Sequence, residues 1–220
     1  MARPNKLIRF EALHHMDTVF EYELNDPEKN KGTWHDVFGN GGNIILELGC
    51  GKGTYTNELA RMHPNNNYIG VDIQGERIFV GAKEAATVPI PNVRYLRTYV
   101  DHLAEWFDPG EVAEIWITFA DPHPTKRKAK KRLTHPKFLA LYKKILAPNG
   151  IVHVKIDSDL LYEFTLESIK EFGCEIVEQI DDVYAEGVDK PVLQNIQTDF
   201  EVRHLAKGRT IHYVAFTLPK

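Results

Sequence analysis

Strand-like and helix-like segments alternate along this chain from about residue 44 to its end, and this alternation constrains the fold most strongly. Runs rich in β-branched and aromatic residues predict strands, and apolar residues at helical spacing predict helices. The expected strands are 44–48, 68–72, 93–100, 115–119, 151–156, 175–180 and 212–218, and the expected helices are 54–62, 75–86, 135–146 and 160–172. Such alternation is typical of βαβ units.

The pattern therefore predicts an α/β fold with a mainly parallel, seven-stranded sheet and helices on both faces. We expect residues 43–220 to form a single domain, because 220 residues with 43% hydrophobic content suffice for one sizeable core. Residues 1–42 are polar and irregular apart from a weakly helical stretch at 7–20, so we expect an N-terminal arm. The basic residues Arg3, Lys6 and Arg9 make this arm either an additional contact for a polyanion or an inert end.

Composition argues against several classes of protein. No run of about 18 apolar residues exists, and the N-terminus lacks the apolar core of a signal peptide, so we expect a cytoplasmic protein without a membrane span. Cys50 and Cys174 are too few for a disulfide scaffold or a four-cysteine zinc site. The ten histidines form no H-E-x-x-H pattern, and we predict no metal.

The charge of the chain is unevenly distributed. Its net charge is −4, which by itself argues against a nucleic-acid partner. Residues 122–156, however, contain ten Lys and Arg and no Asp or Glu, while the other 17 basic and all 31 acidic residues lie elsewhere. A segment of charge +10 thus lies in a remainder of charge −14, and a polyanion responds to that local field.

A glycine-rich turn, E-L-G-C-G-K-G at residues 47–53, follows the first expected strand. Glycines at alternate positions permit positive φ angles and let a ligand approach the bare backbone. A dinucleotide-binding turn needs its third glycine one place later, where Thr54 stands. A phosphate-binding P-loop needs Ser or Thr after Lys52, where Gly53 stands. Neither nucleotide motif fits this turn.

Acidic residues end the next two expected strands. Asp72 closes the second strand, 25 residues after Glu47, and Asp101 closes the third. A carboxylate at the end of the second strand can accept hydrogen bonds from ribose hydroxyls, as in dinucleotide-binding folds. The alternative is that Asp72 and Asp101 only cap helices.

The fourth expected strand leads into Asp121-Pro122-His123-Pro124, where the prolines restrict the loop that carries Asp121. A basic run, T-K-R-K-A-K-K-R at residues 125–132, follows directly. Lys and Arg at this end of a parallel sheet are placed to contact phosphates beside a ligand site. The alternative is a solvated helix face or tail.

Together these motifs resemble those of class I S-adenosylmethionine-dependent methyltransferases and, more narrowly, of the bacterial tRNA (guanine-N7-)-methyltransferase family. The pattern E-x-G-x-G-x-G at 47–53 is similar to the first motif of the class. Residues 119–133 resemble the signature F-x-D-P-x-P-x-K-R-x-x-K-R-R-L of the family, with Lys131 in one basic position. Further similar blocks, in the family's order, are 31–34, 37–40, 67–70, 107–112, 133–135, 155–157 and 198–201.

The resemblance implies a Rossmann-like class I fold with a last antiparallel strand. It implies methyl transfer from S-adenosyl-L-methionine to N7 of a guanosine in the variable loop of tRNA, position 46. By this resemblance Asp121 is the catalytic acid, and the cofactor is bound by Glu47, Gly49, Gly51, Asp72, Asp101 and Asp121. The residues implied to bind the substrate are Thr125, Lys126, Arg127, Lys130, Asp157, Thr198, Asp199, Phe200 and Glu201. The oligomeric state stays open between monomer and homodimer.

Three positions depart from the family's pattern. His123 stands where Trp is usual, and Phe200 replaces the usual Tyr and so lacks its hydroxyl. Thr125 stands where Lys is common, which puts a substrate contact there in doubt, although Lys126 is a neighbouring substitute. None of these departures touches the cofactor motifs.

Two other functions compete with this one. A class I methyltransferase acting on a protein or on a small-molecule amine has the same cofactor motifs, but the uninterrupted basic stretch disfavours a small molecule. A non-catalytic RNA-binding or assembly module would keep the fold alone. The intact Glu47, Gly49, Gly51, Asp72 and Asp121 argue against it.

Overall fold

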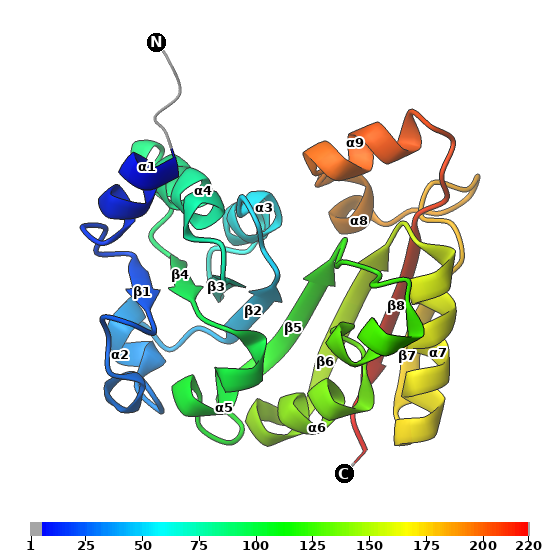
Figure 1. Ribbon diagram of the computed structural model, residues 1–220, viewed down its shortest axis with the longest axis horizontal. Helices are drawn as coiled ribbons and strands as arrows, with labels where there is room; N and C mark the ends of the chain where they lie inside the picture. Colours follow the sequence, from blue (N-terminus) through cyan, green and yellow to red (C-terminus); the bar gives the residue numbers. More distant parts are fainter. Residues whose placement is uncertain (1–5, 220) are drawn as a thin grey trace.

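One sheet of eight strands runs through the computed structural model, which describes residues 6–219 (Figure 1). The strand order is β1-β4-β3-β2-β5-β6-β8-β7. The strands are β1 (Val19–Glu21), β2 (Ile44–Leu48), β3 (Asn67–Asp72), β4 (Val93–Arg97), β5 (Val112–Thr118), β6 (Leu146–Ile156), β7 (Glu175–Ile180) and β8 (His212–Thr217). β8 is antiparallel to both of its neighbours, and the other pairs are parallel. The expected Rossmann-like α/β fold is confirmed.

Helices cover both faces of the sheet because successive side chains of a strand point to opposite sides. Ile44, Leu46 and Leu48 lie in one buried apolar layer, and Ile45 lies in the other. The first layer is shared with α2 (Trp34–Phe38), α5 (Leu103–Trp106), α6 (Pro136–Ile145) and α7 (Asp159–Phe172). The second is shared with α1 (Lys6–Leu13), α3 (Thr54–Met62), α4 (Gly75–Thr87) and α8 (Pro191–Asn195). A ninth α-helix, α9 (Asp199–Leu205), and three 3₁₀ helices, η1 (Pro27–Lys29), η2 (Val100–His102) and η3 (Lys126–Lys131), complete the described elements.

The segment that precedes β2 takes part in the sheet. The stretch expected to be helical over 7–20 ends its helix at Leu13 and continues into β1, which pairs with β4 and adds an eighth strand to the expected seven. Trp34 is fully buried, and its indole Nε1 donates a hydrogen bond of 2.9 Å to the carbonyl oxygen of Trp106. Lys6 pairs with Glu76 at 2.9 Å, whereas Arg3 lies outside the described residues. The division of the chain at residue 42 stays a prediction.

The third expected strand is shorter than predicted. β4 ends at Arg97, whose register partner Asp72 is the last residue of β3. Beyond that point the β-prone residues 98–100 have no strand to pair with, and the chain turns into η2. The prediction that Asp101 closes this strand was wrong, since Asp101 lies within η2.

The parallel strands β2 to β6 end at one edge of the sheet, and the strand order reverses beside β2, with β3 on one side and β5 on the other. Open α/β sheets bind their ligands beyond the carboxyl ends of the strands at such a switch point. Figure 1 shows α8 and α9 beyond the arrowheads of β5 and β6, on the same side. None of the helices in the described part of the chain has the length and apolar character needed to cross a bilayer.

Candidate active site

The glycine turn after β2 contains three glycines with positive φ, and they differ in what surrounds them. A Cβ atom added to Gly49 would find its nearest neighbour, Cδ1 of Leu133, at 3.9 Å, and one added to Gly51 would find the Gly49 carbonyl oxygen at 4.0 Å. A Cβ atom on Gly53 would lie 2.1 Å from the hydroxyl oxygen of Tyr95. Gly53 is therefore required by packing, while a Cβ atom at the exposed Gly49 or the half-buried Gly51 would make only ordinary van der Waals contact.

Asp72 at the end of β3 holds the glycine turn in place. Its side chain is almost buried, Oδ2 accepts a 2.9 Å hydrogen bond from the Gly51 amide, and Oδ1 accepts one of 2.8 Å from the Gln74 amide. The second bond goes to the N-cap residue of α4 and not to an amide within the helix, so Asp72 does not provide a side-chain cap for α4. Each oxygen retains acceptor capacity for a further donor, such as a hydroxyl.

Glu47 lies behind the turn, buried between β2, α3 and β5. Its carboxylate accepts hydrogen bonds from the amide and the hydroxyl of Thr56, at 2.8 Å for the amide, and from the Thr118 hydroxyl at 2.7 Å. Burial raises the pKa of Glu47 to about 7, against the opposing effect of these hydrogen bonds. A cation bound nearby would favour the ionised form. The two threonines were not singled out in the sequence, because their role depends on which elements surround Glu47.

Asp101 has a basic partner of its own. Its exposed carboxylate lies in η2 and pairs at 2.7 Å with the ammonium of Lys137 in α6. The residue that directly follows β4 is instead the buried Thr98, whose amide donates to the carbonyl oxygen of Asp72 at 3.2 Å. The structure thus brings together Glu47, Asp72 and the glycine turn, and leaves Asp101 on the surface.

The loop after β5 carries Asp121 in a strained backbone. Phe119 and His123 have φ angles of 52° and 41°, which non-glycine residues rarely adopt and which recur at functional sites. The Asp121 side chain is 68% exposed, and its Oδ1 accepts a 2.9 Å hydrogen bond from the His123 amide. The carboxylate therefore points into solvent from a loop of defined shape.

The basic run adopts the short helix η3, in which Lys126, Arg127, Lys128, Lys130 and Lys131 are all exposed, as is the preceding Thr125. η3 begins five residues after Asp121. Leu133, just beyond it, provides the atom nearest to Gly49. The basic segment therefore lies beside the glycine turn, at the same edge of the sheet. Arg132 is the exception in this run, because its side chain is buried.

The segment 198–201 begins α9 and divides into outward and inward side chains. The Thr198 hydroxyl accepts a 3.2 Å hydrogen bond from the Glu201 amide and so caps α9. Asp199 forms an ion pair of 2.5 Å with Lys52 of the glycine turn, which places α9 next to that turn. Phe200 is half exposed.

Glu201 and Asp157 are already bonded within the protein. Glu201 is fully buried. Its Oε1 contacts the ammonium of Lys155 at 2.5 Å and accepts a hydrogen bond of 2.7 Å from the Tyr184 hydroxyl. Burial lowers the pKa of Lys155, although Glu201 acts in the opposite direction. Asp157 pairs with His204 and, at 3.2 Å, with Arg209. The sequence did not single out Lys155 as a partner for Glu201, because 46 residues separate them.

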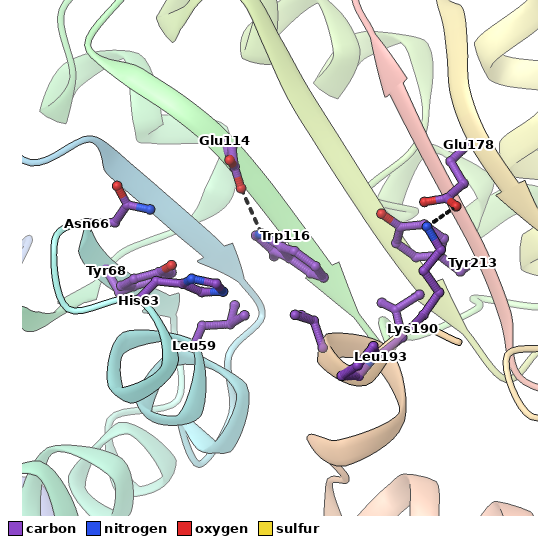
Figure 2. A pocket seen from close by; sticks show the side chains of 12 residues that line it. Leu59, His63, Asn66, Tyr68, Glu114, Trp116, Glu178, Lys190, Leu193 and Tyr213 are labelled. Atoms are coloured by element: carbon purple, nitrogen blue, oxygen red, sulfur yellow. Dashed lines mark hydrogen bonds and ion pairs between the residues drawn. The ribbon is translucent and has the colours of Figure 1, made fainter. Parts of the chain in front are cut away.

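A cavity of about 270 Å³ lies elsewhere, on the face of the sheet covered by α3 and α8 (Figure 2). Its carboxylates have partners within the protein: Glu178 pairs with Lys190 at 2.5 Å, and Glu114 accepts from the Trp116 indole at 3.3 Å and lies 3.4 Å from His153 outside the cavity lining. None of the site residues expected from the sequence lines it. Over residues 6–219, no group of three or more His, Cys, Asp or Glu side chains is arranged to hold a metal ion.

Comparison with known proteins agrees with this geometry. Residues 42–214 match the family described as "Putative methyltransferase". The chain is 41% identical to the tRNA (guanine-N(7)-)-methyltransferase of Bacteroides fragilis (strain YCH46), over 98% of this chain and 86% of the relative. It is 39% identical to the protein of the same name from Christiangramia forsetii (strain DSM 17595 / CGMCC 1.15422 / KT0803), over 99% and 100%.

The crystal structure of the 16S rRNA methyltransferase KamB has a similar fold, with a TM-score of 0.65 at 16% identity over 86% of this chain and 94% of that one. At that identity the likeness concerns the fold alone. The sequence relatives extend over nearly the whole chain, including the glycine turn, the Asp121 loop and η3. The chain belongs to the tRNA (guanine-N(7)-)-methyltransferase family.

Proposed function

We propose that this protein transfers a methyl group from S-adenosyl-L-methionine to N7 of a guanosine in tRNA, at position 46 of the variable loop. The observation that carries the proposal is that the glycine turn, Asp72, the Asp121 loop and η3 lie at one edge of the sheet. The relatives in Bacteroides fragilis and Christiangramia forsetii are named for this activity. The position within the tRNA rests on the family resemblance.

The residues present fit the cofactor. Bound S-adenosyl-L-methionine supplies an electrophilic methyl group on a cationic sulfonium. The exposed Gly49 and the half-buried Gly51 would offer bare backbone to a ligand. Asp72 would accept hydrogen bonds from the ribose hydroxyls, and Glu47 would favour the positively charged amino-acid end. Asp101 fits less well than expected, because its carboxylate pairs with Lys137.

Asp121 would act on the guanine. N7 of guanine has a lone pair and no proton, so no base is needed to create the nucleophile, and positioning and desolvation supply most of the acceleration. The exposed Asp121 carboxylate would accept hydrogen bonds from guanine N1–H and N2–H₂. It would also stabilise the positive charge that develops on the ring during methylation.

The exposed basic side chains of η3 would hold the RNA backbone, with Lys126, Arg127 and Lys130 as the contacts expected from the family. N7 lies on the major-groove edge, which is deep and narrow in A-form RNA. The target guanosine must therefore lie in a loop or be drawn out of its pairing. We place the reaction in the cytoplasm. A monomer and a homodimer are both compatible with it, because every residue invoked comes from one chain.

The test is to incubate the purified protein with unmodified tRNA transcript and methyl-labelled cofactor, digest the RNA and identify the labelled nucleoside. N7-methylguanosine is expected, and a transcript with adenosine at position 46 should remain unlabelled. Label in another nucleoside, or none in RNA, would overturn the proposal. Label that persists in the position 46 variant would overturn the assigned position alone.

A further inference from the structure

Arg132 differs from every other basic residue of the run that follows Asp121. Its side chain is only 7% exposed, whereas all five basic side chains of η3 are exposed. In the sequence it continues a phosphate-binding pattern. In the structure it is turned away from the solvent that a phosphate would occupy.

The guanidinium of Arg132 is bonded to the Asp121 loop. Its Nε donates to the carbonyl oxygen of Pro122 at 2.9 Å, and Nη2 donates to that of His123 at 3.1 Å. These carbonyls belong to the two residues that follow Asp121. The guanidinium carbon also lies 4.4 Å from the ring centroid of Phe164 in α7. α7 and the loop thus hold the guanidinium from two sides.

These contacts restrain the segment that orients the carboxylate. His123 has a φ angle of 41°, and its amide donates to Oδ1 of Asp121. The Pro122 carbonyl and the His123 amide belong to one peptide unit. Because Arg132 holds this carbonyl, it also fixes the amide that donates a hydrogen bond to the Asp121 carboxylate. Strained backbone of this kind persists only where the surroundings over-determine it.

We propose that Arg132 is a positioning residue that presets the Asp121 carboxylate and makes no contact with RNA phosphate. The basic run then has two functions: the exposed side chains of η3 attract the polyanion, and the buried guanidinium shapes the loop. The inference rests on the proposed function where it says that Asp121 acts on guanine. The restraint itself is a property of the protein alone.

An arginine suits this position better than a lysine. Its planar fork donates two hydrogen bonds to separate carbonyls while its face stacks on an aromatic ring. Lysine offers a compact point charge that reaches one carbonyl well. Arg132→Lys should therefore restore only part of what Arg132→Gln removes.

The first experiment needs neither RNA nor cofactor. Hydrogen–deuterium exchange of residues 119–125 is measured in the wild type, Arg132→Gln and Lys131→Gln. Lys131 is the adjacent exposed lysine, so the two variants lose the same charge one residue apart. Exchange should accelerate about tenfold or more in Arg132→Gln and stay at the wild-type rate in Lys131→Gln. Equal rates in all three proteins would overturn the inference whatever the protein methylates.

The second experiment separates positioning from phosphate contact. With tRNA and cofactor, Arg132→Gln should lower kcat about 100-fold and leave the slope of log Kd for tRNA against log salt unchanged. Lys131→Gln should raise KM for tRNA and reduce that slope by about 0.7–0.9. A reduced slope with kcat retained in Arg132→Gln would identify Arg132 as a phosphate contact. Lys170→Gln, an exposed lysine in the last turn of α7, controls for the loss of one charge.

A thermal melt of each variant shows whether it folds. If Arg132→Gln does not fold, Phe164→Leu provides the same test, since it removes the stacking surface and keeps the guanidinium. It should accelerate exchange in 119–125 and lower kcat in the same direction. Wild-type exchange and kcat in Phe164→Leu would overturn the inference. If the wild type itself fails to methylate tRNA, the proposed function fails, while the exchange result still decides the role of Arg132.

Discussion

At the scale of single residues, the site depends on carboxylates in contrasting surroundings. Glu47 is buried among hydrogen-bond donors, and burial raises its pKa to about 7. Asp121 projects into solvent from a strained loop. The first is suited to respond to a cationic ligand, and the second is accessible to a base presented by RNA.

The raised pKa of Glu47 makes the stability of the free protein depend on pH. The folded value of about 7 lies above the ordinary value of 4.5, so folding takes up a proton between these pH values. The stabilisation is complete below pH 4.5 and is lost as the pH rises to about 7, by up to about 3 kcal/mol. Urea denaturation from pH 5 to 8 measures it. In Glu47→Gln the free energy of unfolding should change less with pH over this range. A pH dependence equal to that of the wild type would contradict the attribution of this effect to Glu47.

Asp121→Asn tests whether the charge of this side chain matters. The substitution keeps the shape and removes the charge, and we expect kcat to fall about 100-fold. Cofactor affinity, measured by calorimetry, should stay at the wild-type value. Asp121→Ala should be at least as slow. Wild-type turnover in Asp121→Asn would refute the electrostatic role, and a collapse of cofactor binding would support the other role that the family resemblance implies for Asp121, in the cofactor site.

At the scale of elements, α9 and η3 both lie next to the glycine turn but are held by different contacts. α9 is attached through the buried Lys155–Glu201 pair and through Asp199 and Lys52. η3 has exposed basic side chains, and Arg132 behind it is bonded to the Asp121 loop. One element is anchored by an internal ion pair, and the other presents its charges to solvent.

Removing only one partner of the buried Lys155–Glu201 ion pair should strongly destabilise the folded protein. Glu201→Gln leaves the Lys155 ammonium without its charged partner, and we expect a loss of about 3–5 kcal/mol in the free energy of unfolding. The double variant Lys155→Met/Glu201→Gln should lose less than the sum of the losses of Lys155→Met and Glu201→Gln. Denaturation curves of the four proteins form the thermodynamic cycle. Additive losses would mean that the two side chains do not stabilise each other.

Neutralising η3 should weaken RNA binding in a salt-dependent way. In the triple variant Lys126→Gln/Arg127→Gln/Lys130→Gln, each lost phosphate contact should reduce the slope of log Kd against log salt by about 0.7–0.9. The total change is then about 2–3, measured by filter binding between 50 and 300 mM salt. A slope equal to that of the wild type would remove η3 from the RNA interface.

At the scale of the whole molecule, the described part of the N-terminal segment belongs to the same packed structure as the rest. β1 extends the sheet beyond β4, and Trp34 packs against Phe107 at a centroid distance of 5.4 Å and against Phe20 at 5.1 Å. Arg97 at the end of β4 pairs with Glu21 and with Glu23. β1 is thus the edge strand of the sheet, and Trp34 is part of the buried core on one of its faces.

A chain that starts at residue 43 should therefore fold poorly. It lacks β1 and the buried Trp34, and the loss of a buried tryptophan alone costs about 3–5 kcal/mol. Near-ultraviolet circular dichroism during heating should give a broad transition in place of the cooperative one of the full chain. A cooperative melt within a few degrees of the full chain would support the division at residue 42 into an arm and a domain.

Local patterns in the sequence were sufficient for seven of the eight described strands and for the four longest described helices, α3, α4, α6 and α7. The spacing of apolar residues reports strands and helices because each element repeats with its own period. The glycine turn, Asp72 and the Asp121 loop were found because each follows a strand directly, and parallel strands end at a common edge. The extra strand β1 was missed because three residues are too few to display a period.

Only the tertiary structure decided which partner each of these charged groups meets within the protein. Asp101 meets Lys137, Arg132 meets two loop carbonyls, and Glu201 meets Lys155. The two ion pairs join residues that lie 36 and 46 positions apart in the sequence. For Arg132, the basic run of the sequence fits a phosphate contact equally well. Whether a charged side chain pairs within the protein or faces solvent depends on its surroundings. Those surroundings are set by the packing of segments that are distant in the sequence.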